Sequence, residues 1–201
     1  MAEQALKDIR KDTYLMMHKV EQMLELTEDA FMKNHVQALD QAIEIAAEVK
    51  SREDALTEKL ARLSGTDPQA RSFLPVPMYI EKIAMNIERM VESIRTKIKD
   101  GLLFSDRAIL ETGKLLTKGK DVLKKASELM VTGSAASAEA VRKETEAMVA
   151  MATQYASAHE DRLIAGECSP KSSSVYLCMV YSFEDIASLV KDAVDRKMAS
   201  Q

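Results

Sequence analysis

Several acidic residues occupy positions at which a helix would normally bury apolar side chains, and these residues are the best suited to chemistry. Glu88 and Glu92 lie four residues apart, and Glu53 lies between Val49 and Leu56. Carboxylates with this spacing share one face of a helix, so their oxygens can converge on a cation. A buried carboxylate must otherwise be paired, hydrogen-bonded or protonated, because burying it bare costs free energy. The three glutamates are therefore candidate metal ligands.

Ion pairing is a second explanation of the same carboxylates. Arg89 and Arg95 lie beside the glutamate pair on the same predicted helix, and Arg52 directly precedes Glu53. Glutamates four residues apart are common on any charged helix. The spacing alone therefore leaves two interpretations open, a metal site and a set of salt bridges on a solvated face.

The histidines and cysteines do not complete a metal site or a catalytic one. His18, His35 and His159 fall in three different predicted helices, and His159 is expected to be a buried, hydrogen-bonded structural residue. Cys168 and Cys178 lie ten residues apart without a second pair, which favours half-buried thiols in a reducing compartment. The sequence has no glycine-rich phosphate loop, nucleophile elbow or Cys–His motif, and it does not indicate an enzyme.

The composition predicts that helices must position these residues. The 201 residues include only six glycines, four prolines and no tryptophan, with 30% charged and 46% hydrophobic residues. So few turn-forming residues argue against a sandwich or barrel, and the apolar fraction argues against a disordered chain. The net charge of −4 and the lack of a basic stripe argue against a nucleic-acid partner. No apolar run approaches the roughly 18 residues of a membrane span, and no signal segment follows Met1.

Apolar residues recur at alternating spacings of three and four, which is typical of helices with one buried face. This periodicity predicts an all-α protein with six helices, in which Ser105 and Ser173 act as N-caps. The predicted helices span residues 4–32, 35–63, 78–98, 105–131, 137–164 and 173–198.

The second half of the chain repeats the plan of the first. The apolar pattern of residues 78–98 maps onto that of residues 173–198 with an offset of about 96 residues. We therefore expect two tandem, sequence-related three-helix bundles, at residues 1–99 and 100–201. The same offset pairs Glu184 with Glu88.

One stretch of the sequence resembles a known family. Residues 159–172 read H-E-D-R-L-I-A-G-E-C-S-P-K-S and lead to Tyr176 and Leu177. This stretch is similar to the last helix junction of PhoU domains, most of all to the PhoU-like cytoplasmic domain of bacterial sodium/phosphate cotransporters, in which the pattern is H-x-x-R-L-x-x-G-x-C-S. The I-E-R-M run at residues 87–90 resembles the helix signature of the first PhoU repeat. The resemblance covers nearly the whole chain.

The resemblance implies two three-helix bundles and a role in phosphate homeostasis. PhoU-type proteins are negative regulators, and acidic E/D-x-x-x-D motifs on their helices can hold iron, zinc or other metals. In this chain the first motif is Glu88 with Glu92 in place of the aspartate. In the second motif Glu184 is kept, but Ser188 replaces the second carboxylate and Asp185 replaces the arginine. Any metal is expected at Glu88 and Glu92, with Glu53 or Asp54 contributing from the helix at 35–63.

The resemblance also implies the partners. We expect a cytoplasmic regulator or adaptor, including a peripheral position at the inner face of the membrane. It would dock on a phosphate transporter, of the sodium/phosphate cotransporter or ABC type, or on a sensor histidine kinase. A metal-binding helical bundle and a purely structural dimerisation module are the alternatives, and exposed methionines could support a homodimer.

Overall fold

The computed structural model describes residues 2–200, and that range is helical without a strand. A short helix, α3 (Pro68–Phe73), lies between the second and third predicted helices and was not predicted. The six predicted helices agree to within one turn at each end with six long ones: α1 (Ala2–Lys33), α2 (Val36–Leu63), α4 (Val76–Lys99), α5 (Asp106–Thr132), α6 (Ala135–Ile164) and α7 (Pro170–Ala199). The all-α fold class is therefore confirmed.

Serine hydroxyls define where several helices begin. The Ser105 Oγ accepts a hydrogen bond from a backbone N–H in the first turn of α5, as predicted. The prediction for α7 was wrong, because Ser169 caps that helix by accepting from the N–H of Ser172. Helix α7 therefore begins at Pro170, whose fixed φ suits a first helical position. Ser173 is buried within the first turn and donates its hydroxyl to the Ser169 carbonyl.

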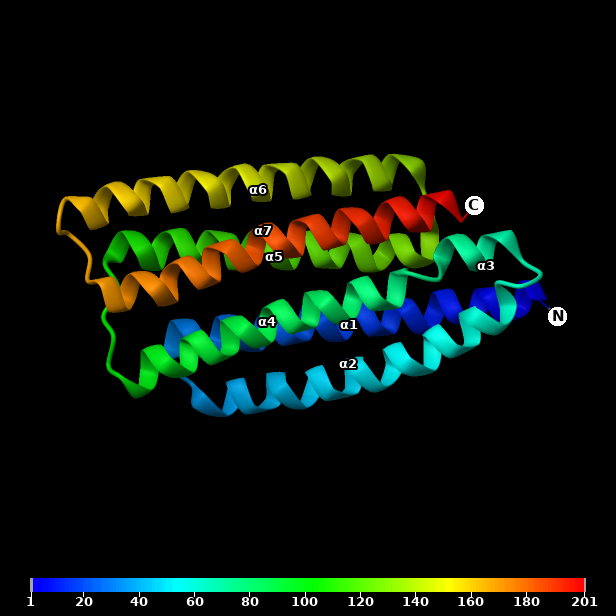
Figure 1. The fold of residues 1–201 in the computed structure, drawn as a ribbon, viewed down its shortest axis with the longest axis horizontal. Coiled ribbons are helices and arrows are strands. Elements are labelled where there is room, and N and C mark those ends of the chain that lie inside the picture. Colours follow the sequence, from blue (N-terminus) through cyan, green and yellow to red (C-terminus); the bar gives the residue numbers. More distant parts are fainter. Residues whose placement is uncertain (1, 201) are drawn as a thin grey trace.

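The six long helices form one bundle with a shared apolar core. Figure 1 shows α2 and α6 at opposite edges of the bundle, with the other long helices between them. Helix α2 packs against α1 and α4, and α6 packs against α5 and α7. The helices before residue 100 meet those after it where α1 packs on α5 and α4 on α7. A single cluster of buried apolar residues runs through both halves. The descent of the halves from one duplicated unit stays a prediction.

A glycine allows the middle of the bundle to close. A Cβ atom at Gly119 of α5 would lie 2.9 Å from Cε1 of Phe183 on α7 and 3.0 Å from Cδ2 of Leu24 on α1. These distances are shorter than ordinary van der Waals contacts, so a larger residue would push the three helices apart. Gly119 therefore fixes how closely α5 approaches both of its neighbours.

Charged residues interrupt the apolar sequence of every long helix. Within residues 2–200, no helix has both the length and the apolar composition that crossing a bilayer requires.

Candidate functional site

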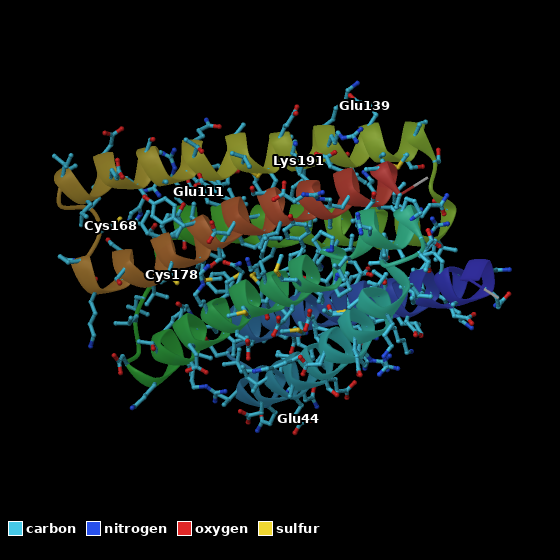
Figure 2. All side chains as sticks on the ribbon, turned by 45° about the vertical axis from the view of Figure 1, so that its right-hand side comes forward. Glu44, Glu111, Glu139, Cys168, Cys178 and Lys191 are labelled. Atoms are coloured by element: carbon cyan, nitrogen blue, oxygen red, sulfur yellow. The ribbon has the colours of Figure 1, made fainter. Side chains whose placement is uncertain are left out.

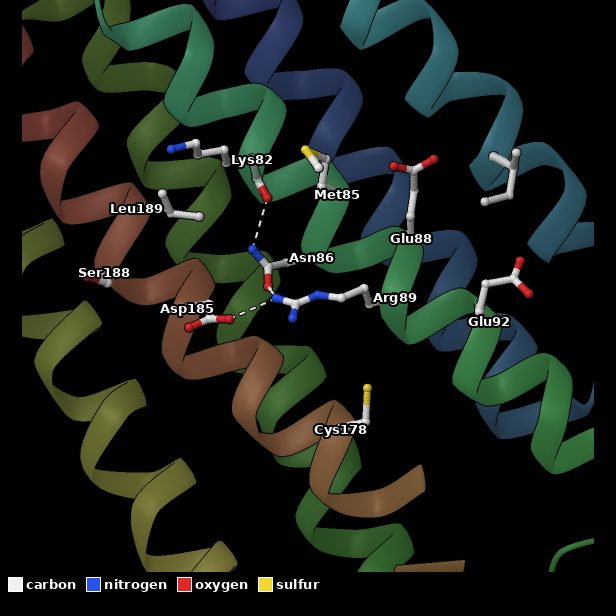
Figure 3. Close-up of a pocket in the computed structure, with 11 residues that line it drawn as sticks. Lys82, Met85, Asn86, Glu88, Arg89, Glu92, Cys178, Asp185, Ser188 and Leu189 are labelled. Atoms are coloured by element: carbon white, nitrogen blue, oxygen red, sulfur yellow. Dashed lines mark hydrogen bonds and ion pairs between the residues drawn. The ribbon is translucent and has the colours of Figure 1, made fainter. Parts of the chain in front are cut away.

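A groove with a volume of about 1080 Å³ runs between α4 and α7, where the two halves of the chain meet. Figure 3 shows its walls, which combine charged, polar and apolar side chains. Met85 is 52% exposed, which leaves a large apolar side chain open to a ligand or partner. The lining residues are Ile43 from α2, Lys82, Met85, Asn86, Glu88, Arg89 and Glu92 from α4, and Cys178, Asp185, Ser188 and Leu189 from α7.

An ion pair joins the two helices across this groove. Arg89 Nη2 donates to the Asp185 Oδ2 at 2.8 Å, and it also donates to the side-chain oxygen of Asn86. Asn86 in turn donates to the Lys82 carbonyl at 2.9 Å. Arg89 and Asp185 are 96 residues apart, which is the offset expected between the two halves. Asp185 therefore supplies the counter-charge for Arg89.

Glu88 is a carboxylate of the groove that has no hydrogen-bond or ion-pair partner in the described structure. Its side chain is half-buried. Burial raises the pKa of Glu88 above its ordinary value, and the nearby charges of Glu81 and Glu92 raise it further against the opposing effect of Lys50. Glu88 also lines a smaller groove of about 300 Å³ between α2 and α4. The site thus presents a carboxylate that is short of a donor or a cation.

Glu92 differs from Glu88 because it has cationic neighbours. Its side chain is exposed, and its Oε1 lies 3.6 Å from Nε of Arg95. The same arginine donates to Asp40 of α2 at 3.0 Å. Figure 3 shows both glutamates pointing away from the Arg89–Asp185 pair. The ion-pair interpretation of the sequence therefore describes Glu92 but not Glu88.

The other predicted ligands lie outside this groove. Glu53 is half-buried and accepts a hydrogen bond from the Thr57 hydroxyl at 2.7 Å, while Asp54 is exposed. Glu184 accepts from Thr153 of α6 at 2.7 Å, so its carboxylate faces α6 and not α4. Between residues 2 and 200, no three His, Cys, Asp or Glu side chains are close enough together to hold a metal ion. The residues present do not fit a closed metal centre.

A buried polar network at one end of the bundle was not predicted. Glu111 of α5 is 4% exposed and accepts two hydrogen bonds from the guanidinium of Arg162 on α6, at 2.8 and 3.2 Å. It also accepts from the Tyr176 hydroxyl of α7 at 2.6 Å and from Nε of Arg107 at 2.9 Å. Glu111 lies three residues after buried Ala108, which places it on the apolar face of α5. This spacing is visible in the sequence and could have identified Glu111 as a buried carboxylate.

The donors around Glu111 control its protonation. Burial raises the pKa of the carboxyl, but the hydrogen bonds from Arg162, Tyr176 and Arg107 outweigh burial and hold the pKa below its ordinary value. Burial, together with the hydrogen bond to the Glu111 carboxylate, raises the pKa of Tyr176 well above its ordinary value, which keeps that hydroxyl a donor. The network is a structural joint between α5, α6 and α7. Within it, the Nε of Arg162 is buried without a hydrogen-bond partner in the described structure.

The remaining histidine and cysteine predictions concern the same region. His159 is buried as predicted and packs on the ring of Tyr176, with ring centroids 4.4 Å apart. Its Nδ1 lies 3.4 Å from Arg162 Nη2, but its Nε2 has no partner in the described structure. Cys168 and Cys178 are both free and half-buried, as predicted.

Comparisons with known proteins agree with this geometry. Residues 13–95 match the model of the PhoU domain. The crystal structure of the phosphate transport system regulatory protein PhoU from Streptococcus pneumoniae superposes with a TM-score of 0.84 at 12% identity, covering 100% of this chain and 96% of the other. PhoU from Pseudomonas aeruginosa gives a TM-score of 0.76 at 16% identity, covering 100% and 98%. No curated protein matches the sequence.

Proposed function

This chain carries a PhoU domain at residues 13–95 and has the PhoU fold along its whole length, and from this premise we propose that it is a regulator of phosphate uptake. The solved structure from Streptococcus pneumoniae is described as a phosphate transport system regulatory protein. The proposed role is regulatory and cytoplasmic: the protein would act by docking on a phosphate transporter or a sensor histidine kinase. The proposed role rests on binding to a partner.

The unpaired carboxylate of Glu88 is the observation that favours the α4–α7 groove as the docking surface. A half-buried carboxylate without a donor gains free energy when a partner brings a lysine or arginine to it. Met85 and Leu189 supply apolar surface beside it, and the exposed Glu92 extends the negative charge. The surface fits a partner segment that presents apolar side chains together with basic ones.

The position of the groove suggests how docking would act. The groove lies where the helices before residue 100 meet those after it, and the Arg89–Asp185 pair bridges the two sides at 2.8 Å. A partner held there would contact both halves of the protein at once, so it would sense their relative position.

Phosphate uptake in cells tests this proposal. Cells that lack the gene should take up radiolabelled phosphate faster, and the wild-type gene should restore the slower rate. Met85→Lys, which adds a positive charge that repels the basic side chains of the partner, should fail to restore it. Met32→Lys is the matched control, because Met32 is 53% exposed against 52% for Met85 and lies on a different surface.

Thermal unfolding of both purified variants must show that each is folded. Full restoration by Met85→Lys would reject the groove as the docking surface. An uptake rate that the gene deletion leaves unchanged would reject the regulatory role itself.

A metal ion at Glu88 and Glu92 is the second candidate function, and the same unpaired Glu88 favours it. Two carboxylates from one helix do not complete a metal site, so the proposed regulation does not pass through a metal. Iron and zinc are the metals to test, by elemental analysis of protein exposed to each. Metal that is lost in Glu88→Gln and Glu92→Gln but kept in Glu53→Gln would support the site. A wild-type protein without bound metal would reject it.

A further inference from the structure

A second groove lies on the side of the bundle away from the α4–α7 groove. Its volume is about 740 Å³, and most of the residues that line it belong to α5, so we call it the α5 groove. Figure 1 shows α4 and α7 in front of α1 and α5, which places the two grooves on different faces. Ile109 and Leu110 line the α5 groove with exposed side chains, and Leu110 is 57% exposed. Exposed apolar side chains that gather in one place mark a surface that binds another molecule.

The inner side of α5 is already occupied by its own chain. Figure 2 labels Glu111 between α6 and α7, where it accepts hydrogen bonds from Arg162 and Tyr176. Leu115 and Leu116 are fully buried. Helix α5 therefore presents only its groove side to another molecule.

Gly113 is a residue of the α5 groove that contacts within this chain do not explain. It lies inside α5 without a positive φ, so its backbone conformation does not require glycine, and glycine weakens a helix relative to alanine. Gly119 has a packing reason, because α1 and α7 approach it closely, but a Cβ atom at Gly113 would meet no atom of the described structure within 4 Å. The close approach of a helix from another molecule would explain this glycine.

The charges beside Gly113 form a pattern that complements itself. Asp106, Leu110 and Lys114 follow one another at intervals of four residues, so they lie on one side of α5, and all three line the groove. Asp106 and Lys114 are exposed, and within residues 2–200 neither takes part in an ion pair or a side-chain hydrogen bond. A second copy of α5 that runs antiparallel about a two-fold axis at Leu110 places each aspartate opposite the lysine of the other copy.

We propose that the α5 groove is the interface of a homodimer, in which α5 packs antiparallel against α5 of a second copy about a two-fold axis at Leu110. The occupant is a second copy, because the charge pattern is completed when the same face is presented twice. Ile109 and Leu110 supply the apolar centre, Gly113 allows the helices to approach, and the two exposed charge pairs set the register more than the affinity. The α4–α7 groove stays open in this dimer, so the inference does not rest on the proposed function.

Exchange of the two charges tests this register. Asp106→Lys and Lys114→Asp each create two like-charged pairs in the symmetric dimer, so each variant alone should dimerise more weakly than wild type by about tenfold or more. An equimolar mixture of the two variants restores both opposite-charge pairs and should form a mixed dimer with nearly the wild-type affinity. Sedimentation at several concentrations measures the association, and native mass spectrometry identifies the mixed dimer by its mass. Asp54→Lys is the matched control, because Asp54 is an exposed aspartate outside the groove, and it should dimerise like wild type.

A substitution at Gly113 tests the close approach of the helices without a change of charge. Gly113→Leu places a side chain between the two copies of α5 and should weaken the dimer by about tenfold or more. The monomer should unfold at a temperature no lower than wild type, because the new side chain meets open space and leucine favours a helix. Gly119→Leu is the contrasting variant, and it should lower the unfolding temperature, since a Cβ atom there lies 2.9 Å from Cε1 of Phe183.

A wild-type protein that sediments as a monomer at every concentration would overturn the proposal. A dimer that the three groove variants leave unchanged would overturn it too, as would a mixture of the charge variants that forms no mixed dimer. Variants that do not dimerise should still restore the slower phosphate uptake, because their α4–α7 groove is unaltered. The same holds for Met32→Lys, since Met32 also lines the α5 groove, so the dimer and the regulatory role can fail independently.

Discussion

Glu88 and Glu111 are two glutamates on the bundle helices that the fold treats in opposite ways. Glu88, in the α4–α7 groove, has no hydrogen bond, and burial raises its pKa. Glu111, at the joint of α5, α6 and α7, is more deeply buried, but donors from three side chains lower its pKa. The residue type and the helical setting are the same, so the difference comes from the donors that other helices bring.

This difference distinguishes a carboxylate that stabilises the fold from one that is available to bind a partner. A buried carboxylate whose acceptor positions are filled holds helices together, and a ligand gains little by approaching it. A carboxylate that the fold leaves without a donor has free energy to gain from a partner. We therefore expect the Glu111 network to stabilise the fold and Glu88 to bind a partner. Substitution of each residue tests these two roles.

Removal of the Glu111 carboxylate should produce the largest loss of stability. Glu111→Ala leaves the buried guanidinium of Arg162 unpaired, and we expect the free energy of unfolding to fall by about 3–5 kcal/mol. Urea unfolding measures this change. Arg107→Ala is the control, because the Arg107 side chain is 64% exposed, and it should cost less than about 1 kcal/mol. A loss below about 1 kcal/mol for Glu111→Ala would show that the network is not a structural joint.

The contribution of Glu111 should disappear in acid. Its folded-state pKa lies below the ordinary value of 4.5 for a glutamate, so the stabilisation is present above the unfolded-state pKa and is lost as the pH falls through the folded-state pKa. Glu111→Gln resembles the protonated residue. The stability difference between wild type and Glu111→Gln should therefore be constant near neutral pH and should narrow below about pH 4.5. A difference that stays constant at low pH would contradict the lowered pKa.

Loss of one donor should cost less than loss of the carboxylate. Tyr176→Phe removes a hydrogen bond of 2.6 Å to Glu111 but keeps both bonds from Arg162. We expect a loss of about 1.5–3 kcal/mol in urea unfolding, typical of a hydrogen bond to a charged group. A loss as large as that of Glu111→Ala would mean that the Tyr176 hydroxyl, and not the Arg162 guanidinium, supplies most of the stability of the network.

The ion pair across the groove should contribute little to stability. The side chains of Arg89 and Asp185 are 58% and 55% exposed, and water screens such pairs. Asp185→Ala should therefore lower the free energy of unfolding by about 0–1 kcal/mol, with a smaller effect in concentrated salt. A loss of unfolding free energy above about 2 kcal/mol would show that the Arg89–Asp185 pair stabilises the fold as the Glu111 network does.

Substitution of Glu88 should have the smallest effect on stability, and it should raise the free energy of unfolding slightly where the other substitutions lower it. The raised pKa of Glu88 means that folding disfavours the ionised form, so the folded protein is less stable wherever Glu88 is charged. Glu88→Gln should leave the unfolding free energy at neutral pH within about 0.5 kcal/mol of wild type or slightly raise it. A clear loss of stability would show that the carboxylate has a structural partner and would end the contrast with Glu111.

The six long helices could be predicted because each buries one continuous face. The apolar residues of that face recur every three or four positions, and this repeat can be recognised within the segment itself. The predicted helix at 78–98 and the observed Val76–Lys99 show how well this period locates an element. Helix α3 was missed because six residues are too few to show a period. The start of α7 was misplaced because four serines lie at or near its beginning, at positions 169, 172, 173 and 174, and only the backbone geometry shows that Ser169 is the cap.

The candidate site was less predictable, since it depends on contacts between distant residues. The spacing of Glu88 and Glu92 placed both on one face of α4, and both line the groove. Glu111 was not selected, although it lies on an apolar face, because its partners Arg162 and Tyr176 are 51 and 65 residues away. The Arg89–Asp185 pair likewise exists only because α4 packs on α7.

Site-specific crosslinking in cells tests the docking claim most directly. A photoreactive amino acid is placed at position 85, in the α4–α7 groove, or at position 32, on the other surface, and the adducts are identified by mass spectrometry. We predict that position 85 forms an adduct with a subunit of a phosphate transporter or with a sensor histidine kinase, and that Glu88→Gln weakens this adduct. An adduct with either partner class from position 32 and not from position 85 would contradict the account.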